Sequence, residues 1–176
     1  MSTLDDLFRQ YLSSIEPSAL AVSRAQAAHG PLREDLEKDA TYGAYLCKTL
    51  LSGSYGRGTS ILYIKDVDVI IETTFTSKDL QDKKRQDETE QGCLLRLTQE
   101  AIKRTGRDAG TRKARRSVHV ELPEEVNDIG QTAPALTMDI VPVLLQSGED
   151  KDPMTIADCE LKGWFDVTVH NLVNSV

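Results

Sequence analysis

The chain has 176 residues, of which 39% are hydrophobic and 28% are charged, and its formal net charge at pH 7 is −7. This length suffices for one domain with a buried core and argues against two domains. The acidic balance argues against a general nucleic-acid coat protein, because such domains are usually basic. No apolar run approaches the roughly 18 residues of a membrane span, and no signal peptide is apparent. Three scattered cysteines, Cys47, Cys93 and Cys159, lack metal-ligand spacing and predict free thiols in a cytoplasmic protein without a membrane partner.

The first forty residues predict helices. Apolar side chains recur at helical spacing over residues 4–15, and Thr3 followed by Asp6 resembles a capping box that begins this helix. Pro17 opens a second, alanine-rich helix, and the Gly30-Pro31 pair is expected to end or kink it. We expect these helices to form a supporting layer for a sheet.

A Gly-Ser pair follows the first predicted strand. Alternating side chains over residues 45–51 predict a strand that delivers the chain into a turn at Gly53 and Ser54. Glycine lets backbone approach a ligand closely, and a hydroxyl with neighbouring N–H groups can hold a phosphate. Residues 55–60 predict a brief helix, in which Arg57 either reaches a phosphate or pairs with an acidic neighbour.

Two aspartates separated by one residue begin the next predicted strand. Asp66 is followed by a β-branched, apolar run, Val67, Val69, Ile70 and Ile71, which Asp68 interrupts. Side chains two apart on a strand point the same way, so the two carboxylates share one face. Like charges this close favour a cation between them, and hard divalent ions are commonly held by carboxylates together with substrate phosphates. An Asp-x-Asp alone usually marks a solvated strand end, but together with the Gly-Ser pair it favours phosphoryl chemistry on a nucleotide.

The middle of the chain is rich in charge. Residues 76–104 predict a helix in their second half, whereas residues 81–91 predict a solvated helix or a mobile loop. The basic run that follows is either a solvated loop or a rim that receives nucleoside triphosphates or an oligonucleotide. It has no aromatic side chains on which bases could stack, so nucleic acid is only weakly supported as a partner. The basic residues are Arg104, Arg107, Arg112, Lys113, Arg115 and Arg116.

Two further strands are predicted, over residues 117–122 and 136–144. His119 falls on the polar face of the first, where its spacing favours a structural role over that of a general base. Asp139 interrupts the apolar run of the second. An acid in such a run is costly to bury alone, which indicates a charged partner or a metal.

The Gly-Ser pair, the Arg57-Gly58-Thr59 run and the Asp66-Val67-Asp68 run together resemble the signature of the DNA polymerase β-like nucleotidyltransferases. Within that superfamily the pattern is most similar to the CD-NTases, bacterial relatives of cyclic GMP-AMP synthase and oligoadenylate synthase that make second messengers in anti-phage defence. The resemblance covers residues 4–164. It implies an α/β (α+β) fold, a nucleotidyltransferase catalytic lobe with a mixed sheet flanked by helices.

The resemblance also implies a site and a reaction. Metal ions, Mg²⁺ or Mn²⁺, would assist nucleotidyl transfer from nucleoside triphosphates, giving a phosphodiester and pyrophosphate, and repetition would close a ring. The product would be a cyclic di- or oligonucleotide. The implied residues are a catalytic and metal-binding triad, Asp66, Asp68 and Asp139, and a nucleotide-binding set, Gly53, Ser54, Arg57 and Thr59.

The C-terminal stretch resembles the passage from the sheet into a second, helical lobe. The resembling residues are Asp158, Gly163, Trp164 and Thr168, although Val169-His170 replace the proline that usually follows. We expect Trp164 to be a packing residue and residues 171–176 to begin a helix. We therefore expect residues 1–176 to form the catalytic lobe, with the helical lobe absent, truncated or supplied by a partner chain. A partner chain or a homodimer would cover the apolar surface left exposed.

Two other functions fit the same residues. A stand-alone nucleotidyltransferase could add AMP to a protein or an RNA, as in toxin–antitoxin systems, and a stable macromolecular partner should then co-purify. A non-catalytic subunit could bind nucleotide or serve in assembly without turnover. The presence of all three acids favours an enzyme.

Overall fold

The computed structural model describes residues 3–107, 110–126, 130, 132–145 and 154–167. Within these ranges the strands are β1 (Leu46–Ser52), β2 (Asp66–Thr73), β3 (Thr111–Lys113), β4 (Val118–Leu122), β5 (Glu125–Val126), β6 (Thr132–Ala133), β7 (Leu136–Leu145), β8 (Met154–Asp158) and β9 (Gly163–Val167). The helices are α1 (Leu4–Ile15), α2 (Ala19–Lys38), α3 (Gly53–Gly56), α4 (Ser77–Lys83) and α5 (Glu90–Arg104), with a 3₁₀ turn η1 (Gly43–Tyr45).

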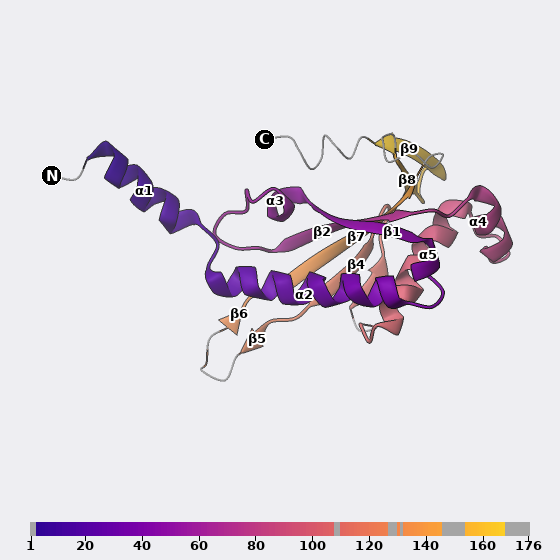
Figure 1. The fold of residues 1–176 in the computed structure, drawn as a ribbon, viewed down its shortest axis with the longest axis horizontal. Helices are drawn as coiled ribbons and strands as arrows, with labels where there is room; N and C mark the ends of the chain where they lie inside the picture. The colour runs from indigo at the N-terminus through magenta and orange to yellow at the C-terminus, as the bar shows by residue number, and fades with distance from the viewer. Residues whose placement is uncertain (1–2, 108–109, 127–129, 131, 146–153, 168–176) are drawn as a thin grey trace.

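One mixed sheet organises the described residues (Figure 1). Its order is β1-β2-β7-β4-β3, and β8 and β9 extend it from β7. The β2–β7 pair is parallel, whereas β1–β2, β3–β4 and β4–β7 are antiparallel. The β5–β6 hairpin forms a separate small sheet. The predicted α/β architecture, a mixed sheet flanked by helices, is confirmed.

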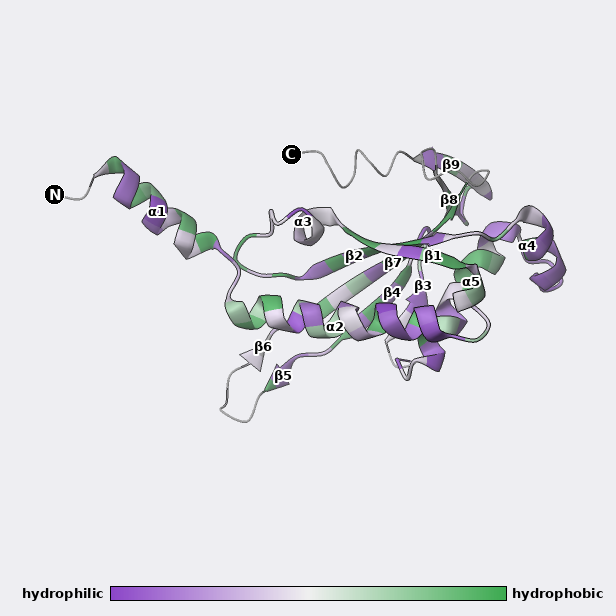
Figure 2. Ribbon diagram, viewed as in Figure 1, coloured by the Kyte–Doolittle hydropathy of each residue, from purple (hydrophilic) through white to green (hydrophobic). Residues whose placement is uncertain are grey.

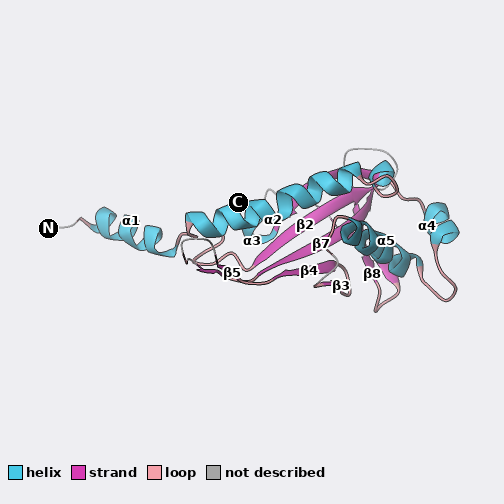
Figure 3. Ribbon diagram, turned by 90° about the horizontal axis from the view of Figure 1, so that it is seen from below, coloured by secondary structure: helices cyan, strands magenta, loops and turns pink. Residues whose placement is uncertain are grey.

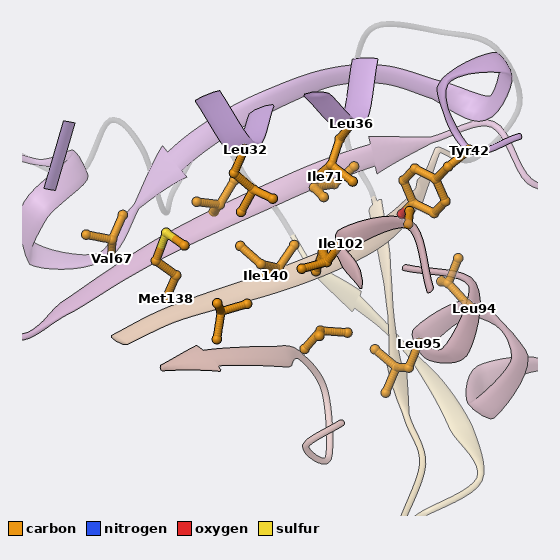
Figure 4. Close-up of a cluster of buried hydrophobic side chains, with 14 of the residues drawn as sticks. Leu32, Leu36, Tyr42, Val67, Ile71, Leu94, Leu95, Ile102, Met138 and Ile140 are labelled. Carbon is orange, nitrogen blue, oxygen red and sulfur yellow. The ribbon is translucent and has the colours of Figure 1, made fainter. Parts of the chain in front are cut away.

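The hydrophobic core lies between one face of the sheet and the helices α2 and α5 (Figure 3). Because strand side chains alternate, every second residue of β2 and β7 faces these helices. Figure 4 shows the resulting cluster; its fully buried side chains include Leu32, Leu36, Ile71, Leu94, Leu95, Ile102, Met138 and Ile140. The intervening residues, among them the three aspartates, are left for the opposite face.

The second helix continues through the Gly30-Pro31 pair, so of the two expected outcomes, an end or a kink, the end is wrong. A proline inside a helix costs roughly 3 kcal/mol, because it removes one hydrogen bond and crowds the preceding turn. Leu32 directly follows the proline, Leu36 lies one turn further on, and both are fully buried in the core. Burying two leucine side chains stabilises the helix by roughly 3–6 kcal/mol, which offsets the proline.

The first helix has the predicted capping box: Thr3 Oγ1 accepts from the N–H of Asp6, and Asp6 Oδ2 accepts from the N–H of Thr3. None of its residues is buried, and it projects from the body (Figures 1 and 2). Its apolar stripe is exposed, with Leu4 82% and Phe8 61% accessible. The expectation that this helix supports the sheet is therefore wrong, whereas for α2 it is correct.

The charge-rich segment forms two helices separated by residues 84–89. The predicted helix in its second half is confirmed as α5, whose N-cap Thr89 accepts from the N–H of Gly92. Arg96 of α5 forms ion pairs with Glu88 and Glu100, with N–O distances of 3.0 and 3.2 Å. The pair with Glu88 joins the segment between α4 and α5 to α5.

Trp164 on β9 packs against the core, as expected of a packing residue. The three cysteines are free thiols. In the described part of the chain, none of the helices has the length and apolar character needed to cross a membrane. The helix expected at residues 171–176 lies outside the described residues, as do Thr168, Val169 and His170.

Candidate active site

The three predicted aspartates lie near the start of the parallel pair β2–β7. In that ladder Asp66 is the register partner of Thr137, and Asp68 is the partner of Asp139. Alternation places all three carboxylates on the sheet face opposite the core, because Val67 and Met138 point into it. Two acidic positions separated by about seventy residues of sequence thus become direct neighbours.

Asp68 has the most perturbed electrostatic environment of the three. Burial raises its pKa above the usual value, and the charges of Asp139 and then Asp66 raise it further, while Arg57 opposes the shift. Mutual repulsion between carboxylates that share a site is relieved when a cation binds between them. A titratable group perturbed by both burial and specific charges is typical of a functional site.

The Asp139 carboxylate is held by Ser117, which directly precedes β4, and by His119 on β4. Ser117 Oγ donates to Asp139 Oδ1 at 3.0 Å, and His119 Nδ1 lies 3.0 Å from the same oxygen. On its other side, His119 Nε2 is 3.5 Å from Glu121 Oε1. The sequence did not predict that His119 and Ser117 contact Asp139. Alternation along the sequence places residues 117, 119 and 121 on one side of the predicted strand. It does not predict that this strand pairs with β7.

Asp66 is also held by a neighbouring strand. Thr137 Oγ1 on β7 donates to Asp66 Oδ1. The N–H of Thr137 donates to the carbonyl oxygen of Lys65 at 2.8 Å, which fixes the start of β2 beside β7. Thr137 was not singled out from the sequence, because a threonine at a strand start carries no signal of its own.

The Gly-Ser pair meets the carboxylates at the end of β1. Ser52 is the register partner of Asp68, so the next residue, Gly53, lies over that side chain. Gly53 has φ +67°, and a Cβ there would overlap Asp68 Oδ2 and lie 2.9 Å from Asp68 Cγ. Both the backbone conformation and the close approach require glycine. The predicted turn is the first residue pair of the short helix α3, which begins two residues earlier than expected.

The other predicted nucleotide-binding residues lie in α3 and in the loop that follows it, and hydrogen bonds within this segment hold them together. The carbonyl oxygen of Ser54 accepts from the N–H of Thr59 at 2.8 Å and from its Oγ1 at 3.4 Å. Ser54 Oγ accepts from Ser60 Oγ at 3.2 Å. The Arg57 charge acts on Asp68. The loop therefore brings Gly53, Ser54, Arg57 and Thr59 to the same end of the sheet as the aspartates.

Most of the predicted basic run is neutralised within the chain. Residues 111–113 form β3, so the run is not simply a solvated loop. Its arginines pair with acids from distant segments, which does not support a free basic rim for nucleic acid. The N–O distances are Arg104–Asp39 2.7 Å, Arg107–Asp35 3.0 Å, Arg112–Glu121 3.6 Å, Arg115–Asp158 2.8 Å and Arg116–Asp158 2.8 Å.

Asp158 anchors two of those arginines from a fully buried position. The hydrogen bond from Arg115 is the main reason that its pKa lies far below the usual range. The N–H groups of Glu160 and Leu161 also donate to its Oδ1, at 3.1 and 3.0 Å. Asp158 is thus a structural residue that joins the β8–β9 turn to the β3–β4 turn, where Arg115 and Arg116 lie.

The donor set suits a hard divalent cation, since oxygen ligands from carboxylates are what such ions take. Among the residues that the structure describes, no three His, Cys, Asp or Glu side chains are already arranged as a metal site. One oxygen each of Asp66 and Asp139 is bound to a neighbouring strand. Asp68 and Asp139 are register partners and Asp66 lies on the same face, and the charges of Asp139 and Asp66 raise the pKa of Asp68, so the donor chemistry fits a cation.

A family model and a curated relative both match nearly the whole chain. The Second Messenger Oligonucleotide or Dinucleotide Synthetase domain matches residues 1–170. A cyclic AMP-AMP-AMP synthase of Acinetobacter sp. (strain ATCC 27244 / 9458) is 29% identical over 171 residues, which is 93% of this chain and 43% of that protein.

Solved structures share the fold. CdnC of E. coli MS115-1 with ATP has a TM-score of 0.60 at 17% identity, over 93% of this chain and 47% of that one. The CdnE c-UMP-AMP synthase of Rhodothermus marinus has a TM-score of 0.52 at 16% identity, over 88% of this chain and 53% of that one. The chain thus spans about half the length of these relatives. The chain belongs to the Second Messenger Oligonucleotide or Dinucleotide Synthetase domain family, and its resemblance to the CD-NTases is confirmed.

Proposed function

We propose that this chain is the catalytic lobe of a nucleotidyltransferase that makes a cyclic di- or oligonucleotide second messenger from nucleoside triphosphates, in anti-phage defence. The carrying observation is that Asp68 and Asp139 are opposed on adjacent parallel strands, with Asp66 on the same face and Gly53 packed over Asp68. Family membership supports the same reaction class, and it implies use of a divalent cation.

Each proposed site residue has a task in that reaction. Asp66 and Asp68 would hold the Mg²⁺ or Mn²⁺ ion that accompanies the triphosphate, and Asp139 would share a second ion. Such ions, when bound, neutralise phosphate charge and lower the pKa of the acceptor hydroxyl. Gly53 and Ser54 bind the β- and γ-phosphates through backbone N–H groups and a hydroxyl, and Arg57 adds positive charge beside them.

The proposed reaction transfers a nucleotidyl group from a nucleoside triphosphate to a hydroxyl. The oxygen of an acceptor hydroxyl attacks the α-phosphorus of a nucleoside triphosphate, and the bond to pyrophosphate breaks. The hydroxyl proton passes to Asp139, which releases it to water, and the pyrophosphate leaves with the electron pair of the broken bond. The residues contribute by orienting the reactants in line and by stabilising the developing charge, the two effects that account for most of the rate in phosphoryl transfer. A second transfer within the site closes the ring.

The relatives indicate which substrates to test first. The Acinetobacter relative is a cyclic AMP-AMP-AMP synthase, and the CdnC structure contains ATP. We therefore propose ATP as the first substrate to examine. CdnC also forms a complex with HORMA-deltaN. A protein partner is accordingly part of the proposal, and so is a contribution from a second lobe, a partner chain or a second copy.

The test is incubation of the full chain with each of the four labelled nucleoside triphosphates and Mg²⁺ or Mn²⁺, with products identified by mass spectrometry. The control is the double variant Asp66→Asn/Asp68→Asn, and Asp82→Asn on the exposed face of α4 is the matched surface change. Cyclic or linear oligonucleotides that vanish only in the double variant support the proposal. Label found on a protein or RNA instead would favour the macromolecule-modifying alternative, and nucleotide binding without turnover would favour a non-catalytic subunit.

A further inference from the structure

Ser117 and His119 contact the same oxygen of Asp139. We propose that these two residues position the third carboxylate, so that Asp139 Oδ2 is presented to the cation and the nucleotide. The inference rests on the proposed function, because it assigns a task within that site. It adds two positioning residues, Ser117 directly before β4 and His119 on it, to predicted residues that lie in α3, in the loop after it, on β2 and on β7.

The geometry of the two contacts fits this task. Ser117 Oγ and His119 Nδ1 each lie 3.0 Å from Asp139 Oδ1. His119 is the register partner of Asp139 in the antiparallel β4–β7 pair, so its ring lies directly beside the carboxylate. Within the described residues, no contact to Asp139 Oδ2 accompanies these two. Two donors on one oxygen restrict rotation of the carboxylate, and in the proposed arrangement the other oxygen is the one that serves the site.

The donor and acceptor roles follow from chemistry. An ionised carboxylate only accepts hydrogen bonds, so in the proposed arrangement Nδ1 of His119 is the donor and Asp139 Oδ1 the acceptor. The ring itself is oriented from its far side, where Nε2 is 3.5 Å from Glu121 Oε1. Glu121 in turn lies 3.6 Å from Arg112 Nε. A line of four side chains therefore runs across β3, β4 and β7 and ends on Asp139.

Asp66 has a parallel arrangement. Its Oδ1 accepts from Thr137 on the neighbouring strand. Two of the three carboxylates thus each have one oxygen bound to an adjacent strand. Partners that orient metal-binding groups in this way typically alter metal affinity 10- to 100-fold when they are removed.

A purely structural role makes a different prediction. The β4–β7 ladder already joins the two strands through five register pairs from Val118↔Ile140 to Leu122↔Leu136. The Ser117 and His119 contacts are partly exposed, and a hydrogen bond of this kind adds only about 1 kcal/mol to stability. Their removal should therefore leave the fold intact and act chiefly on the carboxylate that they hold.

Four single variants test the inference in the full chain. His119→Asn keeps an amide N–H near the position of Nδ1, whereas His119→Gln moves the N–H toward the position of Nε2. Ser117→Thr keeps the hydroxyl, whereas Ser117→Ala removes it. The measurements are the Mn²⁺ dissociation constant, from the electron paramagnetic resonance signal of free Mn²⁺, and the melting temperature without metal.

We expect His119→Gln and Ser117→Ala to weaken Mn²⁺ binding roughly 10-fold, and His119→Asn and Ser117→Thr to remain within about 3-fold of the wild type. All four should melt within a few degrees of the wild type. Equal Mn²⁺ binding by all four variants would overturn the positioning role while leaving the metal site in place. A wild type that binds no Mn²⁺ would overturn the proposed site itself, and this inference with it.

Discussion

Asp68 and Asp139 are direct partners across the parallel β2–β7 ladder, and the charge of Asp139 helps to raise the pKa of Asp68. Parallel strands have their starts at one edge, so two acids from distant segments meet there without any turn between them. The charge repulsion in this pair costs stability, and a cation bound at the proposed site would offset that cost. Metal affinity and fold stability would then be coupled at this edge of the sheet.

Asp68→Asn should stabilise the metal-free fold while abolishing catalysis. Burial and the neighbouring acids raise the folded-state pKa of Asp68, so at pH 7 its charge favours the unfolded state, and the penalty fades as the pH falls through that pKa. We expect a higher melting temperature than wild type without divalent ions, and a loss of product formation of at least about 100-fold. Asp82→Asn should change neither quantity. A lower melting temperature for Asp68→Asn would contradict the repulsion.

Gly53→Ala and Gly58→Ala form a matched pair. Both glycines have φ +67°, but only at Gly53 would a Cβ meet another group, the Asp68 carboxylate; at Gly58 there is nothing within 4 Å. Each change should cost roughly 1–2 kcal/mol of unfolding free energy from the left-handed backbone. Gly53→Ala should in addition displace Asp68 and lower activity about 100-fold relative to Gly58→Ala. Urea unfolding and product formation, measured side by side, separate the two effects.

The Asp39–Arg104 ion pair predicts a specific acid sensitivity. Two hydrogen bonds of 2.7 and 2.9 Å join the groups, and the bond from Arg104 is the main cause that lowers the Asp39 pKa to about 2. Because this folded-state pKa is depressed, the stabilisation is present above about pH 4 and is lost as the pH falls toward 2.

Arg104→Gln should therefore lower the unfolding free energy at pH 7 by about 1 kcal/mol, after allowance for solvent screening. Urea unfolding at pH 7, 4 and 2.5 should show that deficit shrinking as the pH falls. Arg9→Gln, which breaks the exposed Arg9–Asp5 pair on α1, is the control and should have little effect. A deficit for Arg104→Gln that persists unchanged at pH 2.5 would rule out Asp39 as its origin.

Truncation of an apolar side chain should change the free energy of unfolding much more in α2, which packs one face on the core, than in the exposed helix α1. Leu36 is fully buried and Phe8 is 61% exposed. Leu36→Ala should cost 2–5 kcal/mol, as large-to-small changes in a core do. Phe8→Ala should remain within about 0.5 kcal/mol of wild type. Chemical denaturation of the full chain measures both, and a large loss for Phe8→Ala would show that its stripe is packed in solution.

The amino-acid sequence determined the strands and their acidic residues. Alternation over residues 66–73 and 136–145 is a local property of the chain, and it placed Asp66 and Asp68 on one face before any contact was known. The capping residues Thr3 and Thr89 likewise satisfy N–H groups within their own helices, so a short window suffices to recognise a helix start.

Only the tertiary structure decided which elements meet. The addition of Ser117 and His119 to the site depends on the antiparallel register of β4 on β7, which local periodicity does not specify. Likewise, Pro31 remains inside α2 because Leu32 and Leu36 are buried on the sheet, and α1 carries an apolar stripe without a described partner. Periodicity in the sequence predicts which side of a helix or strand is apolar. Which other element packs against that side depends on contacts between segments that are distant in the sequence.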